Sequence, residues 1–353
     1  MHPFTLWYTH NPILDIYFSQ YRNYLDIIVR EITPSESVYP WEFLLIPDIA
    51  TTLEWYKNGG IAIESARHFI IQEYRKFSLW TRGEMLAFQG LVISWTDIRL
   101  TEIDANPNNK NHNHPDQIKN AVWIGWGGIP ENDWRELYGE AFWLLQSISP
   151  GFQDELGRMI RKIIPLGVTK SMHNSASYST CIGHLYMSYP TDMEMPSVAL
   201  LEAIIHESNH NKLNLIMKQD PLVLNSREEI YYSPYRPDSR HIQGIYLWLH
   251  ALVAVIHIFF QAYIARKLPL TPHWIEKCLR YHMKNALSIR VLDKYVHLTS
   301  LGKSIMDEMR AVHAITTEFV HLAQLPRDTK ISAAENTQNH FLQVQKNSQY
   351  LKY

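Results

Sequence analysis

Cysteine is scarce in this chain of 353 residues: Cys181 and Cys278 are the only two, and they lie far apart. This excludes a thiolate zinc site and a disulfide scaffold. Clusters of lysine and arginine are also lacking, and 33 basic residues nearly balance 35 acidic ones, so we expect no nucleic-acid partner. The first residues lack the basic, apolar and small-residue regions of a signal peptide, and we expect a cytoplasmic protein.

Residues 244–265 carry no acidic or basic side chain, and the stretch is long enough to span a bilayer. His250, His257 and Gln261 within it are costly in lipid unless they line a site, and no second span follows. We therefore expect the central helix of a large soluble domain and no membrane partner. A single membrane-spanning helix is the alternative.

Histidine, with 18 residues, is plentiful, and it supplies the sharpest pattern in the chain: His206, Glu207 and His210 in the order HExxH. On a helix, residues four apart share one face about 6 Å apart, so both imidazoles can reach one metal ion beside Glu207. Pro196 is placed to start this helix, and a cluster of ionisable groups among apolar residues needs a compensating charge such as a metal. The alternative is an accidental match, with the histidines held by hydrogen bonds to neighbouring side chains.

A third metal ligand must come from outside the motif. Leu213 and Ile216 occupy the positions that metzincins fill with glycine and histidine, which excludes that class. The glutamates that follow lie in a polar stretch that is typical of a loop. His250 and His257 lie seven residues apart on one face of the next helix, and of these two candidates we favour His250.

These patterns predict a mainly helical α+β fold, in which a small β-sheet lies next to a central HExxH helix and a long apolar helix. Apolar spacing over residues 14–32 and 65–77 indicates helices, and β-branched and aromatic residues at 163–168 and 175–189 indicate two short strands. Polar residues 104–117 are expected to form a surface loop or a domain boundary.

We divide the chain by function into three parts. Residues 1–160 form a variable N-terminal helical region that is a candidate for substrate binding. Residues 161–325 form the catalytic region with the HExxH motif. Residues 326–353 form a polar C-terminal tail, rich in glutamine and asparagine, that we expect to be loosely ordered.

Three segments together resemble a known family: SASYSTCIGHLYMSYP at residues 175–190, LLEAIIHESNHNKL at 200–213, and SPYRPDSRHIQG at 233–244. They are similar to the HExxH-motif peptide β-hydroxylases found beside peptide natural-product clusters, which depend on Fe(II) and α-ketoglutarate (2-oxoglutarate). Two positions depart from the family pattern. Tyr235 stands where tryptophan is usual, and His241 replaces a proline.

The resemblance implies an Fe(II) centre held by His206, His210 and a ligand from the following helix, His250 in our interpretation. Three protein ligands leave open positions for the keto acid and O2. Arg236 or Arg240 is suited to bind the distal carboxylate of 2-oxoglutarate through two parallel hydrogen bonds. The substrate would be a peptide that is hydroxylated at a side-chain Cβ.

Glu207 keeps a second function open. In a zinc metallopeptidase it would be the catalytic base that activates a metal-bound water, whereas in a hydroxylase it would orient a ligand or the substrate. A non-catalytic peptide-binding protein, in which HExxH binds no metal, is the third hypothesis.

Overall fold

Helices dominate the chain and a small sheet accompanies them, so the expected mainly helical α+β fold is confirmed. The computed structural model describes residues 12–34, 39–81, 91–92, 99–100, 124–170, 174–191 and 193–347. The predicted loop at 104–117 lies outside the described residues. The chain divides into two units: unit 1 comprises Met1–Asn11, Leu144–Phe152 and Ile216–Tyr353, and unit 2 comprises Pro12–Trp143 and Gln153–Leu215. The functional division at residue 160 stays a prediction.

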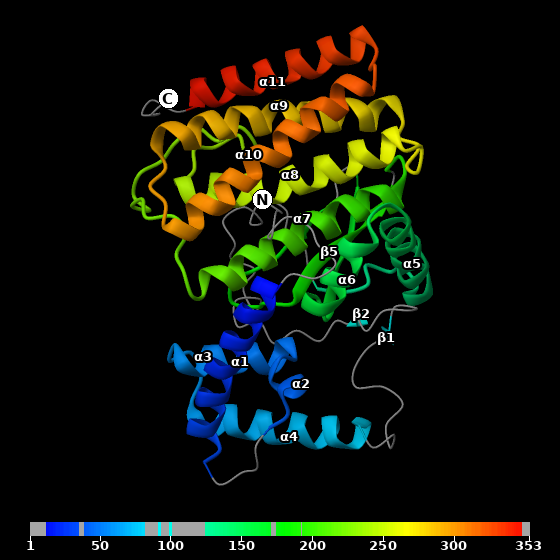
Figure 1. Ribbon diagram of the computed structural model, residues 1–353. Helices are drawn as coiled ribbons and strands as arrows, with labels where there is room; N and C mark the ends of the chain where they lie inside the picture. Colours follow the sequence, from blue (N-terminus) through cyan, green and yellow to red (C-terminus); the bar gives the residue numbers. More distant parts are fainter. Residues whose placement is uncertain are drawn as a thin grey trace. The chain divides into compact units, whose positions relative to one another are not determined.

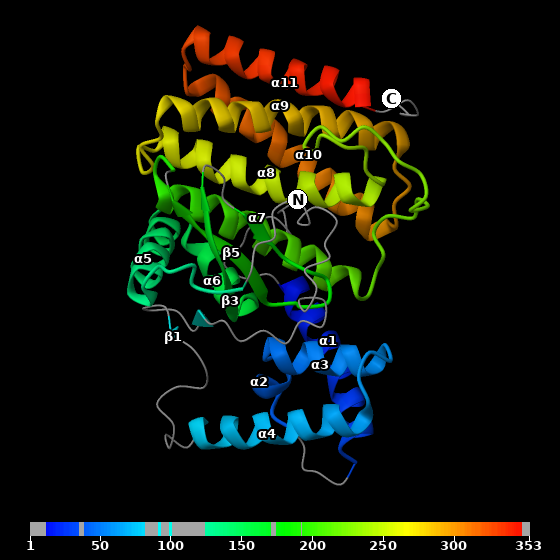
Figure 2. The same ribbon diagram turned by 180° about the vertical axis from the view of Figure 1, so that it is seen from behind.

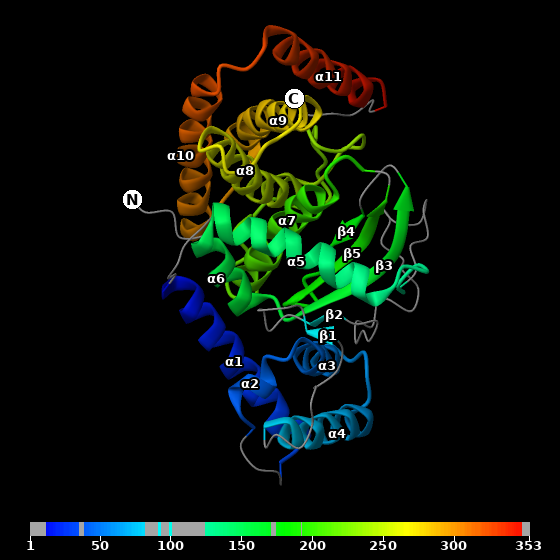
Figure 3. The same ribbon diagram turned by 90° about the vertical axis from the view of Figure 1, so that its right-hand side faces the viewer.

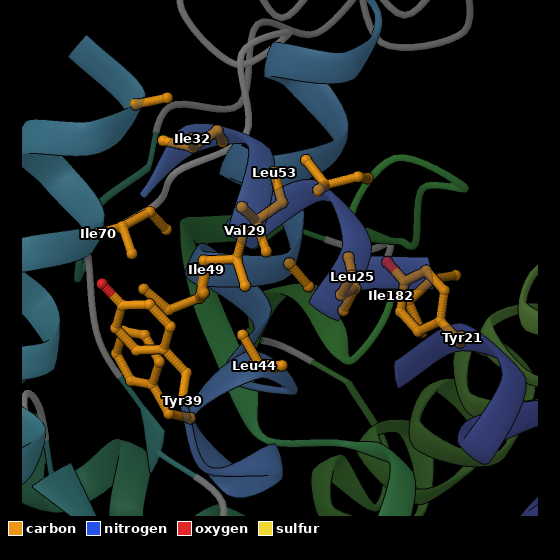
Figure 4. Close-up of a cluster of buried hydrophobic side chains, with 14 of the residues drawn as sticks. Tyr21, Leu25, Val29, Ile32, Tyr39, Leu44, Ile49, Leu53, Ile70 and Ile182 are labelled. Atoms are coloured by element: carbon orange, nitrogen blue, oxygen red, sulfur yellow. The ribbon is translucent and has the colours of Figure 1, made fainter. Parts of the chain in front are cut away.

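Unit 2 begins with helices that enclose an apolar core (Figures 1 and 4). They are α1 (Pro12–Ile32), α2 (Trp41–Leu44), α3 (Pro47–Lys57) and α4 (Ile63–Thr81). In α1, Tyr21, Leu25 and Ile28 recur at three- and four-residue spacing, and all three are buried. Ile182, which precedes a strand, completes this core, so the N-terminal helices and the sheet region share one apolar interior.

The sheet of the described residues has the strand order β1-β2-β3-β5-β4 (Figure 3). Its strands are β1 (Leu91–Val92), β2 (Arg99–Leu100), β3 (Lys162–Lys170), β4 (Ser175–Ala176) and β5 (His184–Thr191). β3 and β5 are parallel, and β4 runs antiparallel to β5.

The predicted strand at 175–189 is therefore two strands, and the prediction of a single one was wrong. A turn separates β4 from β5 and ends at Gly183, whose φ of 88° lies in the left-handed region that glycine adopts without strain. The expected strand at 163–168 is confirmed as part of β3.

A buried ion pair joins α3 to the sheet. The Lys162 ammonium at the start of β3 pairs with the Asp48 carboxylate, and His184 Nε2 lies 3.7 Å from the other carboxylate oxygen. Burial alone would raise the pKa of Asp48, but Lys162 and His184 lower it well below its usual range. Lys162 and Asp48 are both buried, so the ammonium and the carboxylate depend on each other for compensation.

The remaining helices are α5 (Glu131–Ile148), α6 (Pro150–Met159), α7 (Pro196–Met217), α8 (Ile242–Ile264), α9 (Pro272–Tyr295), α10 (Ser300–Leu322) and α11 (Arg327–Asn347). In unit 1, α9 lies between α8 and α11 in both Figure 1 and Figure 2. Side chains cap three of these helices: His241 accepts from the Gly244 amide, Thr271 from Trp274 and Thr299 from Gly302.

Helix α8 is the expected apolar helix. By length and composition it could cross a membrane, and a buried core helix passes the same test. In this structure 83% of the most apolar part of α8 is buried, and buried residues lie on every face of the helix. The packing partners are α9 and α10.

The expectation of a loosely ordered C-terminal tail was wrong for residues 327–347, which form α11. Its composition is polar, yet Ala333, Thr337 and Val344 are buried at helical spacing. This narrow stripe packs on α9, and Asn336 Nδ2 donates to Glu276 Oε1 at 3.0 Å. Packing of one narrow buried stripe is enough to stabilise a helix in a folded protein. The overall composition of a segment does not show whether such a stripe is present.

The buried ion pair predicts a large stability effect. Lys162→Met should lower the free energy of unfolding by about 3–5 kcal/mol, because Asp48 would lose its main compensating charge. Arg30→Met removes an exposed pair with Asp26 and should cost at most about 1 kcal/mol. Urea unfolding measures both. Equal losses in the two variants would contradict the prediction.

A stacked histidine pair predicts acid sensitivity. His282 and His313 lie 4.4 Å apart between ring centroids, and burial lowers the pKa of His282 to about 3 and that of His313 to about 4. Both pKa values lie below the ordinary 6.5, so the stability from the neutral rings is present above pH 6.5 and is lost as pH falls towards 4.

We expect His282→Gln combined with His313→Gln to flatten the fall in unfolding free energy between pH 6.5 and 4.5. The control is His273→Gln, an exposed histidine of α9, which should leave the slope unchanged. An unchanged slope in the double variant, measured by urea unfolding, would show that other groups carry the acid sensitivity.

Candidate metal site

Helix α7 carries the HExxH motif in a setting that buries polar side chains. It begins at Pro196, as the sequence predicted, and its first turns pack through apolar residues such as Leu200 and Ile204. The polar run that follows is buried as well, except for His210, which is partly exposed. The buried members are His206, Glu207, Ser208, Asn209, Asn211 and Lys212. Every one of these side chains needs a partner.

The two histidines of the motif meet at their ring nitrogens. His206 Nε2 lies 3.0 Å from His210 Nε2, and the two rings are perpendicular, with centroids 4.5 Å apart. Two nitrogens that each bind one metal at about 2.0–2.1 Å lie roughly 3 Å from each other. Burial lowers the pKa of His210 to about 4, which keeps its ring neutral at pH 7, as a metal ligand must be. The pair therefore fits two ligands of one divalent metal ion.

Glu207 points to the sheet side of α7 and is held by two hydroxyls. Ser175 Oγ donates to one carboxylate oxygen at 2.7 Å, and Ser177 Oγ donates to the other at 2.6 Å. Burial raises the pKa of Glu207 to about 7, although both hydrogen bonds act to lower it. Near neutral pH this carboxyl group is therefore poised to hold or release a proton.

Asn211 ties the motif helix to the start of β5. Its amide oxygen accepts from the Gly183 backbone N–H at 2.8 Å, and its Nδ2 donates to the His184 carbonyl at 3.0 Å. The same Nδ2 reaches the Glu207 carbonyl at 3.2 Å. One side chain thus connects α7 to the turn that precedes β5.

A second buried ion pair holds the end of the motif. Lys212 is fully buried, and its ammonium pairs with the Glu155 carboxylate of α6. Two residues after His210, this pair anchors α7 against α6 and limits how the last turn of the motif can move.

His250 and His257, the candidates for a third ligand, lie in α8 of unit 1. His250 is completely buried. His257 Nδ1 lies 3.0 Å from Thr316 Oγ1, and its ring lies 5.2 Å from that of Phe319, so its environment is that of a structural residue. Among the described residues, no three histidine, cysteine or acidic side chains are placed to hold a metal together. The structure thus brings together two of the predicted ligands, and the third stays a prediction.

Arg236 and Arg240 both reach the same carboxylate, in the segment that leads into α8. Arg240 Nε lies 2.9 Å from Asp238 Oδ2, and Arg236 Nε lies 3.8 Å from Asp238 Oδ1. Both guanidinium groups keep more than a quarter of their side-chain surface exposed, whereas Asp238 is 53% exposed. Two partly exposed guanidinium groups that already pair with one exposed carboxylate could also bind the carboxylate of a ligand.

A stack of aromatic rings supports Arg236. Its guanidinium lies 5.9 Å from the ring centroid of Trp248, which stacks on Tyr235 at 5.7 Å. The Tyr235 hydroxyl donates to Asn285 Oδ1 at 2.8 Å. Tyrosine thus provides both a stacking face and a fixed hydrogen bond at the position where the family pattern has tryptophan.

Sequence reasoning missed Ser175, Ser177 and Asn211 as parts of this site. The two serines lie inside a segment that resembles the hydroxylase family. They stand two residues apart, on either side of Ala176, and this spacing places both hydroxyls on one face of an extended segment. Asn211, by contrast, has no signal beyond its place one turn after Glu207. Comparison of the chain with protein-family models and with curated proteins found no match.

The paired imidazoles predict metal binding. His206→Ala and His210→Ala should each lower the affinity for Zn(II) or Fe(II) by about 100-fold or more, since even losing an outer partner of a metal ligand costs 10–100-fold. His273→Ala removes an exposed histidine and should bind metal like the wild type. Anaerobic equilibrium dialysis with elemental analysis measures all four proteins. Wild-type protein without metal would instead identify the 3.0 Å contact as a hydrogen bond between the two rings.

Proposed function

We propose that this protein is an Fe(II)- and 2-oxoglutarate-dependent dioxygenase that hydroxylates a side-chain Cβ of a peptide. The observation that carries the proposal is the 3.0 Å approach of His206 Nε2 to His210 Nε2 on a buried helix. The resemblance of three segments to the HExxH-motif peptide β-hydroxylases supports iron as the metal and 2-oxoglutarate as the cosubstrate.

In this proposal His206, His210 and His250 hold the iron. A metal ion with three protein ligands supplies O2 activation when it is bound, with open positions for the keto acid and for O2. In the overall reaction, one oxygen atom of O2 enters the peptide as a hydroxyl group and the other enters succinate, while 2-oxoglutarate loses CO2. The chain's own residues bind and orient the reactants.

Arg236 and Arg240 bind the distal carboxylate of 2-oxoglutarate in this scheme. Asp238 holds both guanidinium groups in the described structure, and the incoming carboxylate would compete with it. Arg236 is the better placed of the two, because the ring of Trp248 beneath it restricts its motion.

Glu207 acts as a positioning residue in the proposed hydroxylase. Its two hydrogen bonds from Ser175 and Ser177 hold α7 at a fixed rotation, which in turn orients His206 and His210. Because both carboxylate oxygens already accept hydrogen bonds, Glu207 is less suited to take a proton from a metal-bound water.

The raised pKa of Glu207 favours one other candidate, a zinc metallopeptidase. A carboxyl group with a pKa of about 7 matches the requirement for a general base at neutral pH. The two functions differ in a simple readout, because a peptidase cleaves peptides with zinc bound and forms no succinate.

Iron-dependent turnover tests the proposal. Anaerobically prepared protein loaded with Fe(II) should convert 2-oxoglutarate to succinate under O2, and His206→Ala, His210→Ala and His250→Ala should abolish this. His257→Ala changes a histidine two turns further along α8 and should retain turnover. Zinc with peptide cleavage would support the peptidase instead. Protein that binds no metal would support a non-catalytic peptide-binding role.

The arginines provide a second, graded test. Arg236→Lys should raise the KM for 2-oxoglutarate by about 30-fold, because losing a hydrogen-bonded charge partner costs at least about 2 kcal/mol. Arg266→Lys, an arginine after the end of α8, is the matched control and should leave the KM unchanged. A change in kcat with an unchanged KM in Arg236→Lys would place this arginine outside the cosubstrate site.

A further inference from the structure

Strand β4 forms the edge of the sheet beside the motif helix. In the strand order of the described residues β4 comes last, so it pairs with β5 on one side and with no described strand on the other (Figure 3). Ser175, Ala176 and Ser177 are all partly exposed. β4, β5 and α7 as far as Leu215 belong to unit 2. The open edge and the HExxH motif are therefore parts of the same unit.

The backbone of Ser175 points to the open edge. In an antiparallel pair, residues that exchange backbone hydrogen bonds alternate with residues whose N–H and C=O groups point away from the partner strand. The Ser188 N–H donates to the Asn174 carbonyl at 2.9 Å, which makes Asn174 a hydrogen-bonded position. Ser175 is the next residue, and it lies opposite Met187. Its N–H and C=O groups therefore point away from β5, and no described residue pairs with them there.

The side chain of Ser175 faces α7, because its hydroxyl donates to Glu207 at 2.7 Å. Ser177 donates to the same carboxylate and so lies on the same face of the segment. A strand added at the open edge would lie about 4.8 Å from β4. In either strand direction its residue opposite Ser175 would share that face, with the two Cβ atoms roughly 5 Å apart. That residue would thus point to the side of the sheet that carries the HExxH helix.

The open edge suits a short extended peptide better than a second copy of this chain. The N–H and C=O of Ser175 match the backbone groups that an extended peptide offers. β4 is only two residues long, and so short an edge limits pairing between two folded proteins. A stable complex of two proteins buries about 1,200–2,000 Å² in total, which a two-residue edge does not supply.

We propose that the open edge of β4 binds the peptide substrate as an added strand, with the residue to be modified opposite Ser175. A peptide carbonyl accepts from the Ser175 N–H, a peptide N–H donates to the Ser175 carbonyl, and the Cβ of the opposing residue points to the α7 side. That the bound peptide is a substrate rests on the proposed function. The strand addition itself requires neither a metal nor 2-oxoglutarate, so it is testable without them.

Ser175→Pro removes the N–H that points to the open edge. Proline is tolerated in an edge strand at a position whose nitrogen faces outward. Ser175→Ala is the matched control, because it also lacks the hydroxyl but keeps the N–H. The two variants should unfold at the same urea concentration, whereas Ala176→Pro removes an N–H that points to β5 and should unfold earlier. Unfolding of Ser175→Pro well before Ser175→Ala would mean that the fold itself uses this N–H, and would overturn the proposal.

Peptide binding is measured with the full chain in EDTA, so that neither a metal nor turnover contributes. The probe is the decapeptide most enriched by the wild type from a random displayed library, synthesised with a fluorescent label. Ser175→Pro should raise its Kd by about tenfold relative to Ser175→Ala, because a peptide carbonyl loses its donor. N-methylation of the peptide, one amide at a time, should weaken binding at alternate amides, as expected for an added strand.

An equal Kd in the two Ser175 variants, or no enriched peptide, would overturn the proposal. A wild-type dimer in sedimentation that Ser175→Pro dissociates would assign the edge to a second copy of the chain, and would overturn it too. Failure of the proposed function gives a different result, since the peptide would still bind at the edge while no succinate is formed. Succinate formation together with equal Kd values would overturn the strand addition alone.

Discussion

The constraint on which this structure depends is that α7 is buried around most of its circumference although its middle is polar. In that position an unmatched side-chain donor or acceptor is costly, because the cost of each orphaned group exceeds what one hydrogen bond contributes. Three neighbours meet this need: the serines of the β4 segment hold Glu207, the start of β5 holds Asn211, and α6 holds Lys212. The arrangement of the sheet edge and of α6 around α7 follows from these contacts. The approach of the two imidazoles is one more result of the same packing.

Local patterns were readable from the sequence where a single segment determined the outcome. Pro196 and the apolar residues after it predicted α7, and β-branched residues predicted β3. Other features were not readable because they depend on residues far apart in the chain. Asp48 and Lys162 are separated by 114 positions, and neither carries a local sign that the other compensates it. Composition misled in one case, since α11 is held by a narrow buried stripe within a polar sequence.

The candidate site shows the same limit. The HExxH spacing predicted that His206 and His210 would share a face, and helical geometry alone guarantees that. The spacing did not reveal that Ser175 and Ser177 would donate hydrogen bonds to Glu207 from a separate segment. It also did not reveal that Asp238 would form ion pairs with both Arg236 and Arg240. The buried ammonium groups of Lys162 and Lys212 each meet a carboxylate from another segment of the chain.

The order of the segments also has a consequence for synthesis on the ribosome. Unit 2 is complete once residue 215 has been made, but unit 1 combines residues 144–152 with everything after 215. Unit 2 can therefore fold while the rest of the chain is still being translated, and the short segment 144–152 must wait for its partners. Ser147, whose carbonyl accepts from Lys267 Nζ at 3.0 Å, gains that contact only after 120 further residues have been added. The nascent chain would thus carry a finished motif helix before the bundle that contains His250 exists.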